Sequence, residues 1–195
     1  MRPTILFILA VLFSSSVAAA DVSDVAAFLA GGAAGVAIHE SAHGAGALAM
    51  DRNFRYVAAS DHAGYETTGH LEEKDGLVAG AGLVAQMGFA EIGHRHDGLF
   101  WRGAVWGGVV HSLLYVADYW WIGHANHMDG HRPLGDIQVI EHVSGKTTAD
   151  LFAATLAAWS AWLAWRDIHR NDPPEVSIKP MPVPGGMGAA LSMRF

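Results

Sequence analysis

One apolar segment, Val25–Met50, most constrains how this chain can fold. Its only ionisable side chains are His39, Glu40 and His43, which belong to the HExxH motif read as HESAH. Ionisable groups are unfavourable in a lipid-facing or tightly packed helix, so three of them together indicate a buried functional site. In helical geometry His39 and His43 lie one turn apart, with both imidazoles on one face. The segment therefore predicts a helix that carries a metal site.

The chemistry of the motif favours zinc. Two imidazoles at this spacing can bind one Zn²⁺, and Glu40 beside them can act as a general base. The chain contains no cysteine, which excludes disulfides and thiolate zinc sites, whereas its 12 histidines supply nitrogen ligands. A catalytic zinc also needs a third protein ligand and an open position for water. We expect one zinc ion per chain.

The apolar segments, rather than the average composition, predict a membrane protein. The chain is 51% hydrophobic and only 16% charged, whereas soluble proteins have about 25% charged residues. A net charge of −7 gives no basic patch and argues against nucleic acid as a partner. Four apolar segments are each about long enough to cross a bilayer as a helix: Val25–Met50, Gly76–Gly93, Leu99–Ile122 and Ala149–Trp165. Small residues such as Gly31 and Gly35 suit closely packed membrane helices. The rival interpretation is an exported, soluble helical bundle.

The ends of the chain differ from its middle. Arg2, an apolar stretch and the small residues Ala18–Ala20 are typical of a signal peptide over residues 1–20. Residues 21–170 are then expected to form an all-α, multi-pass membrane bundle of about four helices, in the inner membrane of a bacterium. Residues 171–195 contain several prolines and predict an extended or disordered tail.

Two motifs and their order resemble the site-2 protease family of intramembrane zinc metalloproteases. The first is the HExxH, and the second is the later Asn126…Asp129-Gly130. The resemblance implies that His39, His43 and Asp129 bind zinc. It also implies that Glu40 activates the attacking water and that Asn126 lies near the oxyanion. The implied substrate is a membrane protein or membrane-associated peptide, cleaved within the lipid bilayer.

The third ligand remains open on the residues alone. The prolines usual between Asn and Asp-Gly in that family are missing here, and Asp-Gly is also a common turn. Asp136, Asp118 and Glu91 are the alternatives to Asp129. His111 and Asp118 lie seven residues apart on an apolar helix and are predicted to share a face, where they can pair or support the site.

A different enzyme class also fits part of the pattern. Glu40-x-x-His43 and Glu91-x-x-His94 are two ExxH motifs, which di-iron carboxylate bundles combine with two further glutamates. Glu66 and Glu141 are the candidate partners, although neither falls in an apolar helix. A related interpretation takes His39-x3-His43 and the group His124, His127 and His131 as the histidine boxes of a membrane oxidoreductase.

A non-catalytic role is the third alternative. Histidines gather in or beside polar loops, where they can bind a metal or be merely solvated: His62, His70, His94, His96, His124, His127, His131 and His142. The sequence does not indicate the oligomeric state.

Overall fold

The computed structural model describes the backbone of residues 22–58, 63–122, 128–129, 132–133, 135–170, 175–183 and 186–194. In chain order these residues form α2 (Val22–Ala49), β1 (Phe54–Ala58), β2 (Ala63–Thr67), α3 (Glu73–Gly93), α4 (Leu99–Ala117), a π-helical segment η1 (Asp118–Ile122), β3 (Met128–Asp129), β4 (Arg132–Pro133), α5 (Asp136–Ser144), α6 (Lys146–Ile168), β5 (Glu175–Val183) and β6 (Gly186–Arg194).

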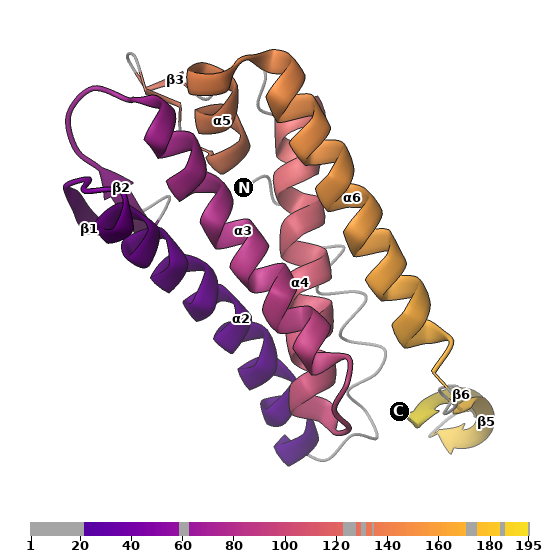
Figure 1. Cartoon of the computed structure of the whole chain (residues 1–195). Helices are drawn as coiled ribbons and strands as arrows, with labels where there is room; N and C mark the ends of the chain where they lie inside the picture. Colours follow the sequence, from indigo (N-terminus) through magenta and orange to yellow (C-terminus); the bar gives the residue numbers. More distant parts are fainter. Residues whose placement is uncertain are drawn as a thin grey trace.

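Most of the described chain is helical, as predicted. Each of the four apolar segments lies largely within one helix: α2, α3, α4 with η1, and α6. These helices pack along one another, and the short α5 contacts α3 and α6 at one end of the bundle (Figure 1). Neither α5 nor the β1–β2 hairpin was expected from the sequence. The predicted signal peptide lies outside the described residues.

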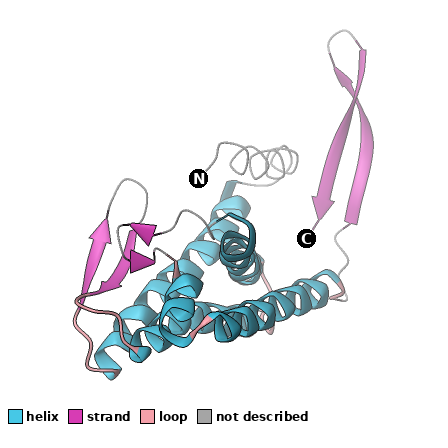
Figure 2. Ribbon diagram, turned by 90° about the horizontal axis from the view of Figure 1, so that it is seen from above, coloured by secondary structure: helices cyan, strands magenta, loops and turns pink. Residues whose placement is uncertain are grey.

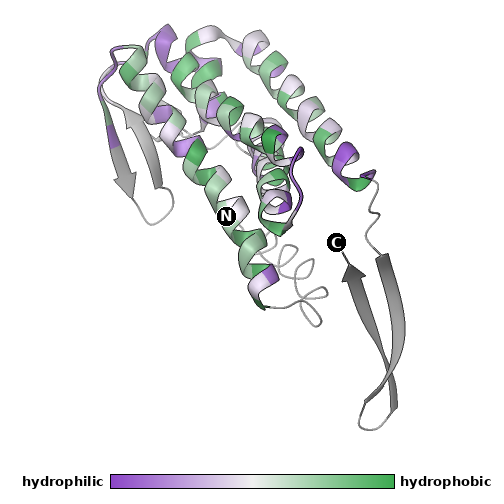
Figure 3. Ribbon diagram, turned by 60° about the horizontal axis from the view of Figure 1, so that its bottom comes forward, coloured by the Kyte–Doolittle hydropathy of each residue, from purple (hydrophilic) through white to green (hydrophobic). Residues whose placement is uncertain are grey.

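Helix α2 buries one narrow stripe of its surface. Five of its six buried residues recur at every fourth position, Gly31, Gly35, His39, His43 and Ala47, and the sixth, Gly44, lies beside His43. Outside this stripe the helix presents large apolar side chains, among them Leu29 at 56% and Leu48 at 71% exposed. Figure 3 shows that apolar residues continue along most of its length. By length and composition, α2 and α3 can each cross a membrane.

Glycines allow α2 to approach α4 closely. A Cβ atom added to Gly107 of α4 would lie 2.7 Å from the Cα of Gly32. A Cβ added to Gly31 would overlap the Phe100 carbonyl, and one added to Gly103 would overlap the Phe28 carbonyl. The predicted close packing through small residues is therefore confirmed for this helix pair.

The start of α3 is fixed by a buried ion pair. Asp75, in the first turn of the helix, accepts hydrogen bonds from the Glu72 N–H at 2.7 Å and from Arg52 Nε at 3.0 Å. Arg52 Nη2 donates to the second carboxylate oxygen at 2.8 Å and to the His70 carbonyl at 2.7 Å. The carboxylate caps free helix N–H groups while Arg52 neutralises it. This contact joins the end of α2 to the beginning of α3, across the base of the β1–β2 hairpin.

The chain beyond residue 170, where an extended or disordered tail is predicted, contains two extended strands. β5 and β6 form an antiparallel hairpin in which Glu175 pairs with Arg194 and Val183 with Gly186 (Figure 2). Because the sheet has only two strands, backbone pairing satisfies the N–H and C=O groups on the facing edges of β5 and β6 alone, and Pro180 and Pro182 have no N–H to donate. The alternation of apolar and small residues in the final segment is the local signal for this strand.

Candidate metal centre

Three side chains from two distant helices converge on one point. His39 and His43 come from α2, and Asp136 is the first residue of α5. The Nε2 atoms of the two histidines lie 3.0 Å apart, and Asp136 Oδ2 lies 3.2 Å from His39 Nε2 and 3.5 Å from His43 Nε2. This group of ligand atoms, all within 4.8 Å of one another, is compact enough to hold a metal ion.

The hydrogen bonding of the imidazoles suits a metal. His43 Nδ1–H donates to the Val78 carbonyl of α3 at 2.8 Å. In the neutral ring Nε2 then carries the lone pair, and this atom faces His39 Nε2 at 3.0 Å. Asp136 Oδ2 is buried without a hydrogen-bond partner. A cation between the three ligand atoms would satisfy this oxygen and the imidazole lone pairs together.

A glycine of α3 makes room for the two imidazoles. A Cβ added to Gly82 would lie 2.5 Å from both Cε1 and Nε2 of His43 and 3.0 Å from Cε1 of His39. Contacts below 3 Å with rigid rings require the rings to move. Position 82 therefore accepts only glycine, because any side chain there would displace the two imidazoles.

The third member of this group is Asp136, one of the alternatives to Asp129. Burial by itself raises the pKa of the Asp136 carboxyl, but the adjacent imidazoles of His39 and His43 outweigh burial and hold that pKa below its ordinary value. The carboxyl group of Asp136 is therefore ionised at neutral pH. Two residues along α5, Gln138 Nε2 donates a hydrogen bond to Asp118 Oδ2 at 2.9 Å. This bond fastens the start of α5 to the end of α4.

Glu40 lies beside the cluster rather than within it. Its Oε1 is 3.9 Å from His39 Nε2, and its side chain is 23% exposed, whereas the side chain of His39 is fully buried. A carboxylate next to the ligand atoms, but still partly accessible, is placed to take a proton from a water at the site.

Helix α4 supplies two further polar groups around His39. His111 Nδ1–H donates to Gln86 Oε1 of α3 at 2.6 Å, and the Tyr115 hydroxyl lies 3.5 Å from His39 Nε2. The rings of His39 and His111 meet edge to face, with centroids 5.1 Å apart. The predicted pairing of His111 with Asp118 is not what these contacts show, because His111 bonds Gln86 and Asp118 bonds Gln138.

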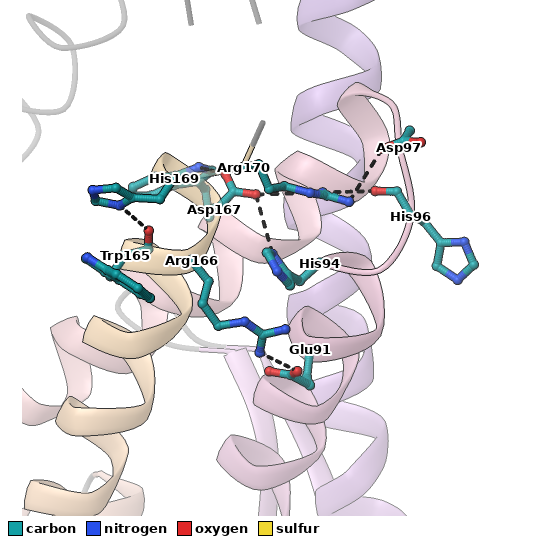
Figure 4. Close-up of polar contacts among 10 residues, drawn as sticks. Glu91, His94, His96, Asp97, Trp165, Arg166, Asp167, His169 and Arg170 are labelled. Atoms are coloured by element: carbon teal, nitrogen blue, oxygen red, sulfur yellow. Dashed lines mark hydrogen bonds and ion pairs between the residues drawn. The ribbon is translucent and has the colours of Figure 1, made fainter. Parts of the chain in front are cut away.

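The second ExxH motif belongs to another set of contacts, near the C-terminal ends of α3 and α6 (Figure 4). Arg166 Nη1 donates to Glu91 Oε1 at 2.6 Å, and His94 Nδ1 lies 3.8 Å from the buried carboxylate of Asp167. Trp106 Nε1 donates to the same carboxylate at 2.8 Å. Glu91 and His94 are thus engaged with α6 rather than with the cluster at His39.

Several predicted site residues fall outside the described part of the chain. Asn126 is one of them, as are His124, His127 and His131. Asp129 lies in β3, where its backbone pairs with Arg132, and its side-chain placement is not described. Among the described residues, His39, His43 and Asp136 form the one compact group of histidine and carboxylate ligands.

Sequence reasoning missed most of the residues that surround the ligands. Gln86 is a polar residue in an apolar helix, one turn after Gly82, and this spacing places both on one helix face. Tyr115 follows His111 by one turn in the same way. Periodicity can therefore indicate which residues share a face, but nothing in the sequence shows that these faces meet the HExxH helix.

Comparison with known proteins gives no relative from which to transfer a function. No protein-family model, curated protein or solved structure matches this chain. The function must therefore be argued from the site itself.

Proposed function

We propose that this protein is a membrane-embedded zinc metallopeptidase that hydrolyses peptide bonds of membrane-associated substrates, as the resemblance to the site-2 protease family implies. The observation that carries the proposal is the convergence of His39, His43 and Asp136 beside Glu40. Two imidazoles and one carboxylate, with the carboxylate of Glu40 beside them, match the ligand set and general base of a zinc hydrolase.

In this proposal the three ligands hold the metal ion, and Glu40 transfers the proton during hydrolysis. Zn²⁺ held by His39, His43 and Asp136 would supply Lewis acidity, which lowers the pKa of a water and polarises the substrate carbonyl. Glu40 accepts the proton of that water as its oxygen adds to the carbonyl carbon. The same carboxyl group then returns the proton to the leaving amine when the C–N bond breaks.

The surroundings of the site support a membrane location. The site helix α2 exposes apolar side chains outside its single buried stripe, and α2 and α3 are long and apolar enough to cross a bilayer. Water cannot solvate such a surface favourably, whereas lipid can. These features support a membrane location, and we propose the bacterial inner membrane, with several helices crossing it and the ligands enclosed between them.

The proposal is tested on the full chain purified in detergent. Elemental analysis should find one zinc per chain in the wild type and in Glu40→Gln, but none in His43→Ala. Hydrolysis of a quenched fluorescent membrane peptide should be lost in both variants, because Glu40→Gln keeps the ligands and removes only the base. If the wild type binds zinc but does not hydrolyse the peptide, the protein is a non-catalytic metal-binding protein. If elemental analysis finds two irons per chain, the peptidase proposal is wrong and the oxidoreductase alternative is supported.

A further inference from the structure

The hydroxyl group of Tyr115 reaches the point where the three ligand atoms meet. It lies 3.5 Å from His39 Nε2, the same atom that is 3.0 Å from His43 Nε2 and 3.2 Å from Asp136 Oδ2. We propose that Tyr115 is a catalytic residue that donates a hydrogen bond to the oxyanion formed during peptide hydrolysis. This inference rests on the proposed peptidase function, and it assigns to α4 a part of the reaction that the HExxH motif does not contain.

The Tyr115 ring packs against His111 of α4, which in turn is hydrogen-bonded to Gln86 of α3. Its centroid lies 5.0 Å from that of His111 and 5.5 Å from that of His39, and the His111 ring meets it edge to face. His111 is itself oriented by the 2.6 Å hydrogen bond to Gln86, a side chain that is fully buried. A donor held by packing and hydrogen bonding loses little entropy when it binds a developing charge.

The reaction needs such a donor in addition to the base. As the water oxygen adds to the carbonyl carbon, the C=O electron pair moves onto the carbonyl oxygen. Tyr115 O–H donates a hydrogen bond to that anion and keeps its own proton, while Glu40 carries the proton from the water to the amine. Tyr115 and Glu40 come from different helices, and both lie within 4 Å of His39 Nε2, at 3.5 Å and 3.9 Å.

The test compares Tyr115→Phe with Tyr119→Phe in the full chain in detergent. Both changes remove one hydroxyl group, and Tyr119 lies one turn further along in η1, in the core rather than among the ligand-site contacts. Zinc content, peptide hydrolysis and the affinity of acetohydroxamate, an anion that binds zinc, are measured for each.

We expect Tyr115→Phe to keep one zinc per chain, to lower kcat about 100-fold with KM little changed, and to weaken acetohydroxamate binding about 10-fold or more. Tyr119→Phe should leave all three quantities at wild-type values. Loss of zinc in Tyr115→Phe would overturn the inference, because Tyr115 would then be a ligand or a structural residue. Unchanged kcat and hydroxamate affinity would overturn it as well.

The hydroxamate measurement separates this inference from the proposed function. If the wild type binds zinc but hydrolyses no peptide, the peptidase proposal fails. Weaker acetohydroxamate binding in Tyr115→Phe would still support Tyr115 as the donor to an anion at the site. If instead Asn126→Ala lowers kcat and hydroxamate affinity and Tyr115→Phe does not, the oxyanion donor is Asn126 and the inference is wrong.

Discussion

Gly82 faces His43 so closely that a Cβ atom on Gly82 would lie 2.5 Å from the Nε2 of the imidazole. Helix α3 therefore reaches the metal site with its backbone, and not only through the hydrogen bond that Val78 accepts from His43. The two contacts are one turn apart on α3. Together they fix the imidazole in position and in tautomer.

This contact predicts the effect of a single methyl group. Gly82→Ala should displace the imidazoles of His43 and His39 and lower zinc affinity at least 10-fold, because ligand geometry tolerates little displacement. Zinc titration with a competing chelator measures the change. Gly88→Ala is the matched control. Gly88 lies in the same helix, and a Cβ atom added there would have no heavy atom within 4 Å. Equal zinc affinity in both variants would contradict the observed packing.

The identity of the third ligand can be decided by two substitutions. Asp136→Asn replaces a charged ligand by a neutral amide and should lower zinc affinity by about 100-fold or more. Asp129→Asn should bind zinc like the wild type if Asp136 is the ligand. Zinc retained in Asp136→Asn and lost in Asp129→Asn would restore the ligand set that the family resemblance implies.

The bond between Gln138 and Asp118 predicts a positioning role outside the ligand set. Asp118→Ala removes the acceptor of the 2.9 Å hydrogen bond from Gln138, which fastens α5 to the end of α4. We expect zinc affinity to fall about 10–100-fold, as for other groups that support a metal ligand. Asp97→Ala is the control, because Asp97 is fully exposed beyond the C-terminal end of α3, where it pairs with Arg170. Equal zinc affinity in the two variants would show that Asp118 does not position Asp136.

His94 predicts a pH dependence of stability. Burial lowers its pKa from 6.5, and the positive charges of Arg166 and Arg170 lower it further, against the opposing effect of Asp167 and Glu91. Between that lowered pKa and 6.5, the unfolded chain binds a proton at His94 that the folded chain does not. The free energy of unfolding must therefore fall as the pH falls below 6.5.

Replacing the histidine should remove this contribution. Thermal unfolding in detergent, followed from pH 7.5 to pH 5, should show a smaller loss of stability for His94→Gln than for the wild type. His142→Gln, at an exposed position of α5, controls for the loss of a histidine as such. A pH dependence in His94→Gln as steep as in the wild type would assign the effect to other groups.

Much of the helical architecture follows from local pattern. The apolar segments predicted the helices because continuous runs of apolar residues of this length favour buried or lipid-facing helices. The spacing of His39 and His43 placed both imidazoles on one face, and the structure has both rings buried there. The β1–β2 hairpin and α5 were missed because both lie in the polar stretches between the apolar segments. In α5 the apolar residues Ile137, Ile140 and Val143 do recur at helical spacing, but the helix has only nine residues.

The sequence by itself predicted two histidines of the candidate metal centre, with Glu40 beside them, because an HExxH motif on one helix is a local arrangement. Only the tertiary structure decided which carboxylate completes the group and which neighbours hold it. Asp136, Gly82 and Tyr115 belong to three other helical elements, and their distances to His39 and His43 depend on how those elements pack. Packing of this kind comes from many contacts between residues far apart in the chain, and no short motif encodes it.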